Sequence, residues 1–211
     1  YGETIAPLPW PTFAPPLSDF DGPGESDMFY NNGTVFKTAS YTYSSDAFTV
    51  GLGVDDLSTD TDNAVGIEAT ATATFGAVSA ALYGTYDVDA EEATISGYLA
   101  AEVGPGTAYL MGAYSSGDNF YTKDKNKIDT AEWGIGAAYS FKATDKLTLT
   151  AQGMYYDSVD FEDVNAWSAD LLVEYQLAEG LKASADVQYV DSDSADLDNA
   201  WGGYVRLTRS F

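Results

Sequence analysis

The chain has 211 residues, enough for one sizeable domain, and its 33 acidic and 9 basic residues give a formal net charge of −24. Such a charge repels nucleic acid phosphates and excludes a nucleic-acid-binding role. The 16 Tyr, 10 Phe and 4 Trp are too many for a disordered acidic chain. The absence of cysteine excludes disulfides and thiolate metal sites from this sequence.

The first segment, residues 1–32, is rich in proline. Six of the seven prolines fall in it, at positions 7, 9, 11, 15, 16 and 23. Because proline has no N–H for the strand ladder, we expect a loop region here, with at most the edge of one strand. We treat residues 33–211 as a second region.

From residue 33 onward, short segments alternate apolar and polar side chains. We expect strands at about 34–43, 47–55, 64–75, 77–87, 93–103, 107–115, 131–142, 147–157, 166–177, 181–190 and 200–211. Tilted membrane-spanning strands need about 9–11 residues, which these lengths provide. Short turns alternate with longer connections at 56–63, 88–92, 116–130, 158–165 and 191–199. This asymmetry is typical of outer-membrane β-barrels.

Residues 69–86 carry no charge and nominally approach the length of a membrane-spanning helix. Their alternating residue pattern predicts strands instead. Thr70, Thr72 and Thr74 alternate with alanines, and Gly76 then interrupts the pattern. A helix would show a period of about 3.6 residues, so we expect two strands joined by a tight turn.

The alternation assigns side chains to two faces, because successive strand residues point to opposite sides. One face of the segment 181–189 holds Leu181, Ala183, Ala185, Val187 and Tyr189, and the other holds Lys182, Ser184, Asp186 and Gln188. In a barrel the first set faces lipid and the second faces the lumen. A soluble β-sandwich with its apolar face inward is the alternative. Trp133, Trp167 and Trp201 near strand ends favour the barrel, since they match the aromatic girdles of membrane interfaces.

Closure adds a constraint. Eleven consecutive antiparallel strands leave the first and last running in the same direction, so these two cannot pair antiparallel and seal the edge. An unpaired edge in lipid leaves backbone groups unsatisfied at high cost. We therefore expect an all-β fold, a transmembrane antiparallel β-barrel, of which this chain supplies the C-terminal part.

The end of the chain carries a family resemblance. The residues Trp201-Gly202-Gly203-Tyr204-Val205-Arg206, followed by Arg209-Ser210-Phe211, resemble the ending of alphaproteobacterial porins, especially those of rhizobia and brucellae. Segments 41–48 and 112–118 resemble turn and strand ends of the same family. The resemblance implies a trimeric general porin of the bacterial outer membrane, with about sixteen strands when complete. It also implies that residues 1–32 belong to a constriction loop and that Phe211 is read by the barrel-insertion machinery.

Enzymatic outer-membrane barrels use a histidine as general base, and this sequence has none. Any such activity would require a histidine upstream of this sequence. We expect no enzymatic activity and no cofactor.

The loops are acidic. Asp191, Asp193, Asp196 and Asp198 have spacings close to those of calcium loops, but the central glycine and the closing glutamate are missing. Two interpretations stay open: solvated loops, or divalent cations that bridge these loops to lipopolysaccharide. Loop 122–130, with Lys123, Lys125 and Lys127, is the only locally basic loop and is suited to contact lipid phosphates.

The face assignment also predicts the lining of the lumen. Its acidic members are Glu68, Glu102, Glu132, Asp170, Glu174 and Asp186, and its basic members are Lys142, Lys182 and Arg206. A three-residue turn at 178–180 would place Gln176 opposite Lys182 and Asp170 opposite Gln188. Arg206 is expected near mid-height, facing an inner loop that bears Asp19, Asp21, Glu25 and Asp27. Opposed charges of this kind favour small polar solutes, although simple solvation of these residues is the alternative.

The predicted function is passive diffusion of small hydrophilic solutes and ions through a water-filled outer-membrane channel that prefers cations. The alternative is a structural or adhesive barrel that binds a partner through its loops or trimer surface. Strand number separates the two, because about sixteen strands leave an aqueous channel whereas about eight to ten fill with side chains.

Overall fold

The computed structural model describes residues 37–57, 64–121, 131–159, 161–193 and 199–210. Within these ranges the chain forms eleven β-strands close to the predicted segments. They are β1 (Lys37–Ser44), β2 (Phe48–Asp56), β3 (Val65–Phe75), β4 (Val78–Asp87), β5 (Glu92–Val103), β6 (Gly106–Ser115), β7 (Ala131–Lys142), β8 (Leu147–Val159), β9 (Ala166–Ala178), β10 (Leu181–Ser192) and β11 (Ala200–Arg209).

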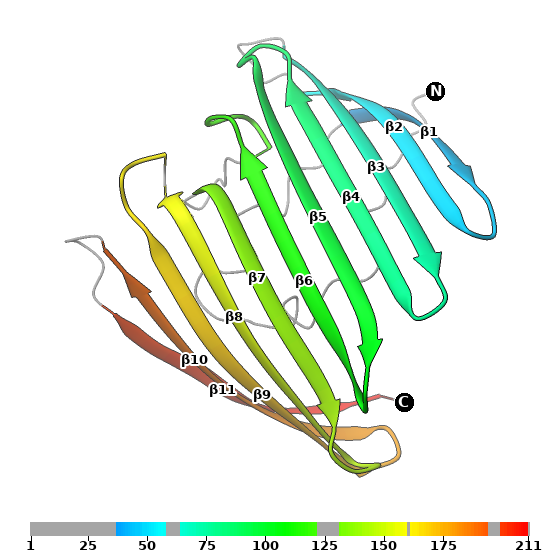
Figure 1. Ribbon diagram of the computed structural model, residues 1–211, viewed down its shortest axis with the longest axis vertical. Coiled ribbons are helices and arrows are strands. Elements are labelled where there is room, and N and C mark those ends of the chain that lie inside the picture. Colours follow the sequence, from blue (N-terminus) through cyan, green and yellow to red (C-terminus); the bar gives the residue numbers. More distant parts are fainter. Residues whose placement is uncertain (1–36, 58–63, 122–130, 160, 194–198, 211) are drawn as a thin grey trace.

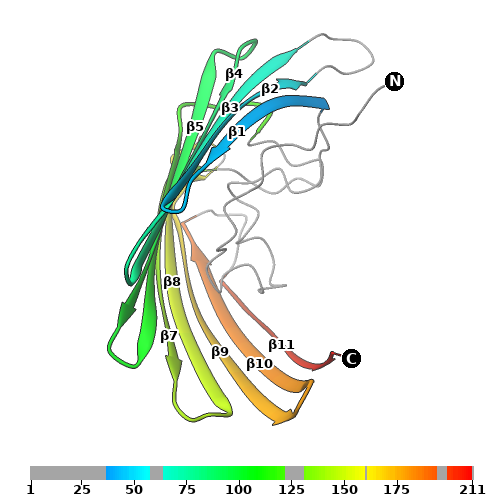
Figure 2. The same cartoon turned by 90° about the vertical axis from the view of Figure 1, so that its right-hand side faces the viewer.

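The strands form a single antiparallel sheet in chain order, with β1 and β11 at its two edges. Figure 1 shows the strands side by side, and Figure 2 shows that the sheet is one curved layer with a concave and a convex side. Among the described residues, no helix is long and apolar enough to cross a membrane. The predicted all-β antiparallel fold is confirmed.

The short turns explain the strand register. Gly76, with φ of 61°, and Gly180, with φ of 69°, adopt the left-handed conformation that glycine tolerates best. The turn before β10 is smaller than predicted, because Ala178 still pairs with Leu181 and the extra residue is taken up in a bulge between Leu181 and Lys182. The bulge leaves the cross-strand partners as predicted: Lys182 lies opposite Gln176, and Gln188 lies opposite Asp170.

The connection between β4 and β5 covers residues 88–91, one residue fewer than the predicted 88–92. The Asp87 carboxylate closes the turn by accepting hydrogen bonds from the N–H groups of Asp89, at 3.1 Å, and Ala90, at 3.0 Å. Glu91 completes the turn with a φ of 59°.

The two faces of the sheet differ in the direction predicted for a barrel wall. Large apolar side chains are exposed on the outward, convex face of successive strands. They include Val50, Leu52, Ile67, Leu82, Ile95, Leu99, Leu110, Ile135, Leu171, Val187 and Val205. The inward, concave face holds buried polar groups, such as Glu68, Gln152, Asp170 and Gln188. A soluble sandwich would bury the apolar face, whereas a continuous exposed apolar surface marks contact with lipid.

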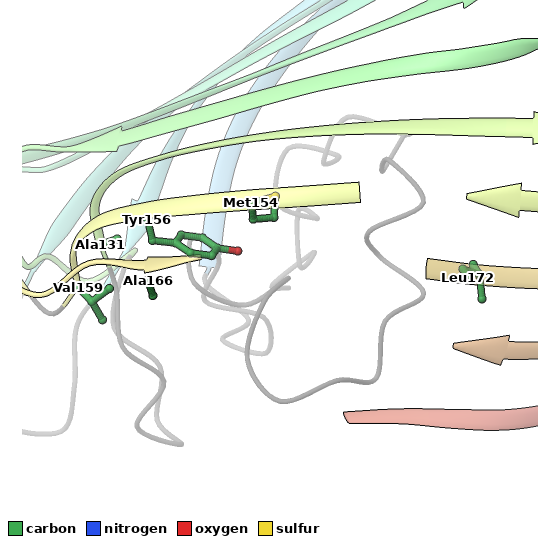
Figure 3. Close-up of a cluster of buried hydrophobic side chains, with 6 residues drawn as sticks. All are labelled: Ala131, Met154, Tyr156, Val159, Ala166 and Leu172. Carbon is green, nitrogen blue, oxygen red and sulfur yellow. The ribbon is translucent and has the colours of Figure 1, made fainter. Parts of the chain in front are cut away.

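The apolar core of the described part is small. Its main cluster consists of Ala131, Met154, Tyr156, Val159, Ala166 and Leu172. Figure 3 shows these side chains on β7, β8 and β9, with Tyr156, which is 1% exposed, as the largest. A small core is expected when most apolar side chains face outward instead of toward one another.

Candidate functional site

A polar row crosses the inward face of β8–β10. Asp170 of β9 and Asp186 of β10 are 5% and 8% exposed. The side-chain amide of Gln152 on β8 donates to Asp170 Oδ2 at 2.8 Å. Gln152 lies opposite Asp170, and Asp170 lies opposite Gln188. Alternation therefore builds a continuous Gln–Asp–Gln row across three strands.

Basic side chains lie next to this polar row. Lys182 of β10 forms an ion pair with Glu174 of β9, a diagonal contact because Glu174 itself lies opposite Ser184. Arg206 of β11 also lies opposite Ser184, from the other side. Its guanidinium carbon is 4.6 Å from the centroid of the Tyr204 ring, the geometry of a cation–π contact. The inward face of β8–β11 thus presents both signs of charge within a few residues.

The structure brings several predicted site residues onto one surface. Those on the inward face of β9–β11 are Asp170, Glu174, Lys182, Asp186 and Arg206. The other predicted site residues, Asp19, Asp21, Glu25, Asp27 and Phe211, lie outside the described residues, as do loop 122–130, Asp196 and Asp198. Their roles stay predictions.

A second polar region lies on the inward face of β2–β4, toward their longer connections. Asp55 of β2, Glu68 of β3 and Asp87 of β4 are 1%, 3% and 6% exposed. The Tyr83 hydroxyl donates to Glu68 Oε2 at 2.9 Å. Gly53 makes room for this carboxylate, since a Cβ there would lie 2.7 Å from Glu68 Oε1.

The segment that follows β6, residues 116–121, packs against this second region, and we call it the strap. The Phe120 N–H donates to Asp87 Oδ2 at 3.0 Å, and the Tyr121 hydroxyl donates to Asp55 Oδ2 at 2.6 Å. The strap therefore reaches from β6 past β5, β4 and β3 to β2. Its first residue, Ser116, stays close to β5 through an Oγ contact with Glu92.

Asn119 organises the strap. Its Nδ2 lies 3.1 Å from Thr94 Oγ1, 3.1 Å from Ser115 Oγ and 3.0 Å from the Gly117 carbonyl oxygen. Its Oδ1 accepts a hydrogen bond from the Tyr121 N–H at 2.9 Å. Asn119 is 1% exposed and Ser115 is fully buried.

The ionisation of Tyr121 fits its role as a donor. Burial raises the pKa of the Tyr121 hydroxyl above its ordinary value, and the hydrogen bond to Asp55 raises it further. The hydroxyl keeps its proton at physiological pH and donates a hydrogen bond to the Asp55 carboxylate.

Sequence reasoning placed Glu68 of this second polar region in the lumen but missed Asp55 and Asp87. Asp55 and Asp87 fall on the lumen side of β2 and β4, so extending the face assignment to these strands would have found them. Asn119 and Tyr121 lie beyond the end of β6, where no periodic signal exists.

The described residues contain no group of three or more acidic side chains placed to hold a metal ion. Asp191 and Asp193 accept hydrogen bonds instead. Trp167 Nε1 donates to Asp191 at 3.2 Å, and the Asn165 amide donates to Asp193 at 3.3 Å. These contacts show that Asp191 and Asp193 have hydrogen-bond donors within the described residues.

Aromatic side chains form a belt on the outward face near the same end of β7–β11. Trp133 and Tyr155 have ring centroids 5.4 Å apart, Trp167 and Tyr189 5.3 Å, and Tyr189 and Trp201 4.8 Å. Trp and Tyr concentrate where lipid headgroups meet the hydrocarbon, so the belt marks a membrane interface.

Comparison with known proteins agrees with this geometry. Residues 20–207 match the family model described as "Porin subfamily". The chain is 35% identical to "Outer membrane protein IIIA" of Rhizobium leguminosarum bv. viciae, over 89% of this chain and 56% of that protein. It is 32% identical to "Porin Omp2a" of Brucella suis biovar 1, over 50% of this chain and 28% of that protein. The chain thus spans about half the length of the rhizobial relative.

Among solved structures, the chain resembles a loop L8 deletion mutant of OmpT, an outer membrane protein of Vibrio cholerae. The TM-score is 0.62 at 19% sequence identity, over 89% of this chain and 68% of that chain. This likeness supports the barrel fold. The predicted family, the outer-membrane location and the expectation of a non-enzymatic protein are confirmed, since porins are channels. The curved wall with a polar inward face, the family match and the relatives lead to one conclusion: the chain belongs to the porin family of bacterial outer-membrane proteins.

Proposed function

We propose that the complete protein conducts small hydrophilic solutes and ions by passive diffusion through a water-filled barrel and that it prefers cations. The observation that carries the proposal is the polar, largely acidic inward face of the sheet. Its acidic residues are Asp55, Glu68, Asp87, Glu102, Glu132, Asp170, Glu174 and Asp186, against Lys142, Lys182 and Arg206. Acidic walls raise the local concentration of cations.

The proposal includes the rest of the barrel. Further strands would bring the total to about sixteen, which leaves an aqueous channel. Residues 1–32 would contribute the constriction loop, with Asp19, Asp21, Glu25 and Asp27 facing Arg206. The inward position of Arg206 on β11 and the family resemblance of the chain support this arrangement.

Reversal potentials across a planar bilayer under a salt gradient test the cation preference. We expect cation selectivity that strengthens at low salt, where the Debye length is long. Arg206→Ala should increase the preference, whereas Arg209→Ala, on the outward face of the same strand, should leave it unchanged. Anion selectivity of the unmodified protein would refute the proposed preference. A folded protein without conductance would favour the structural or adhesive alternative.

We further propose a homotrimer that contacts lipid through its outward face and lipopolysaccharide through its external rim, with divalent cations bridging at the acidic loops. The aromatic belt supports a fixed position of this rim at the membrane interface. Phe211 is proposed as the assembly signal. Deleting it should strongly reduce heat-modifiable, folded protein in outer membranes, and unchanged amounts would contradict this role.

A further inference from the structure

We propose that the strap is a fixed narrowing of the channel entrance and that Tyr121 holds it in place, so that Tyr121 sets the largest solute that passes. This inference rests on the proposed pore function and adds a size-selecting element to it. The strap is distinct from residues 1–32, the predicted constriction loop.

The strap lies on the inward side of the sheet. Its partners Thr94, Asp87 and Asp55 all point inward at the same edge of the wall, near the start of β5, at the end of β4 and near the end of β2. A segment bound to inward side chains occupies volume on the concave side of the wall. In a closed barrel that volume is taken from the lumen, at the mouth on the side of the longer loops.

The Tyr121 ring packs closely against the wall. Its ring passes over Gly66 of β3, where a Cβ would lie 1.8 Å from the hydroxyl oxygen and 2.7 Å from Cζ. The ring also packs against Leu57, which is 1% exposed, with Ala64 and Phe120 beside it. The wall therefore has space for this phenol ring because residue 66 is a glycine without a side chain. We call this space the seat of the ring.

Buried hydrogen bonds from Tyr121 and Asn119 fix the strap to the wall. Tyr121 donates to a carboxylate at 2.6 Å, and Asn119 joins the strap to β5 through Thr94 at 3.1 Å. Both strap residues are buried, so water does not compete for their partners, and buried hydrogen bonds are stronger than exposed ones. Gly117 fits closely as well, since a Cβ there would lie 2.5 Å from Glu92 Cδ. The strap is thus held as part of the wall.

The chemistry of the strap indicates what it selects. Tyr121 and the Phe120 N–H give neutral donors to Asp55 and Asp87, so the strap covers carboxylates with phenol and amide groups. Selection at this narrowing should depend on solute size. Selection by charge belongs to the β9–β11 wall, where Lys182 and Arg206 lie.

Two variants test the inference in the complete protein. Tyr121→Phe removes only the hydroxyl, and Gly66→Ala fills the seat of the ring. Losing a hydrogen bond to a charged group shifts a local opening equilibrium by roughly 10- to 150-fold, so amide hydrogen exchange in residues 116–121 should accelerate by about that range. Both variants should raise single-channel conductance and let larger oligosaccharides enter proteoliposomes in swelling assays.

Matched controls keep the test specific. Tyr114→Phe changes a hydroxyl on the outward face of β6, and Gly84→Ala adds a methyl group whose nearest contact is an ordinary 3.9 Å. Both controls should behave like the unmodified protein. Faster exchange with unchanged conductance and size limit would overturn the inference, as would unchanged exchange in Tyr121→Phe. An unmodified protein that folds without conducting would overturn the pore function itself, and the two failures are thereby distinguished.

Discussion

The inward wall contains two polar regions that satisfy their carboxylates in different ways. On β2–β4, Asp55, Glu68 and Asp87 accept hydrogen bonds from neutral donors, namely two tyrosine hydroxyls and three backbone N–H groups. On β8–β11, Asp170 also accepts from a neutral donor, the Gln152 amide. Glu174, in contrast, forms an ion pair with Lys182, and the Lys182 and Glu174 side chains are 39% and 23% exposed. The first region is covered by the strap, and the second is open enough for water to reach its ion pair.

This difference indicates that one region is held rigidly and that the other produces the stronger local electric field. Neutral donors to buried carboxylates fix a geometry without adding opposite charge, whereas exposed ion pairs hold geometry weakly but leave strong local fields near the solute path. We infer that β2–β4 shapes the entrance and that β8–β11 orients charged solutes. Three experiments test this comparison between the β2–β4 and β8–β11 regions.

The largest effect is expected at Asn119. Asn119→Ala removes the side-chain amide contacts to Thr94 and Ser115, each worth about 0.5–1.5 kcal/mol. It also leaves the buried Tyr121 N–H without its acceptor, at a further cost of about 1–3 kcal/mol. Hydrogen exchange of residues 116–121 measures the local opening free energy. Asn165→Ala is the control in the other region, because Asn165 makes an exposed 3.3 Å contact with Asp193 and should change local stability by no more than about 1 kcal/mol. Equal losses in the two variants would contradict the comparison.

An intermediate effect is expected for Tyr121 and Asp55. A double-mutant cycle with Tyr121→Phe and Asp55→Ala should give a coupling free energy of about 1.5–3 kcal/mol, the range for a hydrogen bond to a charged group. The coupling should be nearly independent of salt, because the two groups are buried and Tyr121 is neutral. Additive single-variant effects would show that the contact does not hold the strap.

The smallest effect is expected for Lys182 and Glu174. A cycle with Lys182→Met and Glu174→Gln should give only about 0.2–1 kcal/mol, because solvent screens the partly exposed pair. The coupling should fall further at high salt, where the Debye length is short. A coupling as large as that of Tyr121 and Asp55 would erase the proposed division between the two regions.

The strands, their faces and much of the register follow from the residue pattern alone. Alternation with a period of two assigns Asp170, Lys182 and Asp186 to the inward face, because successive strand side chains point to opposite sides. The partners of Gln176 and Asp170 were also predictable, since a short turn fixes the register of a hairpin. The tail resemblance indicated the family that the comparisons confirmed.

The position of the strap and the contacts that hold it depend on long-range packing. Tyr121 and Asp55 are 66 residues apart in the chain, and nothing periodic links a loop residue to a strand end at that separation. The contact depends on the curvature that brings β2–β6 around a common concave side and on the absence of a side chain at Gly66. Local alternation sets which way a side chain points, whereas long-range packing sets what it meets.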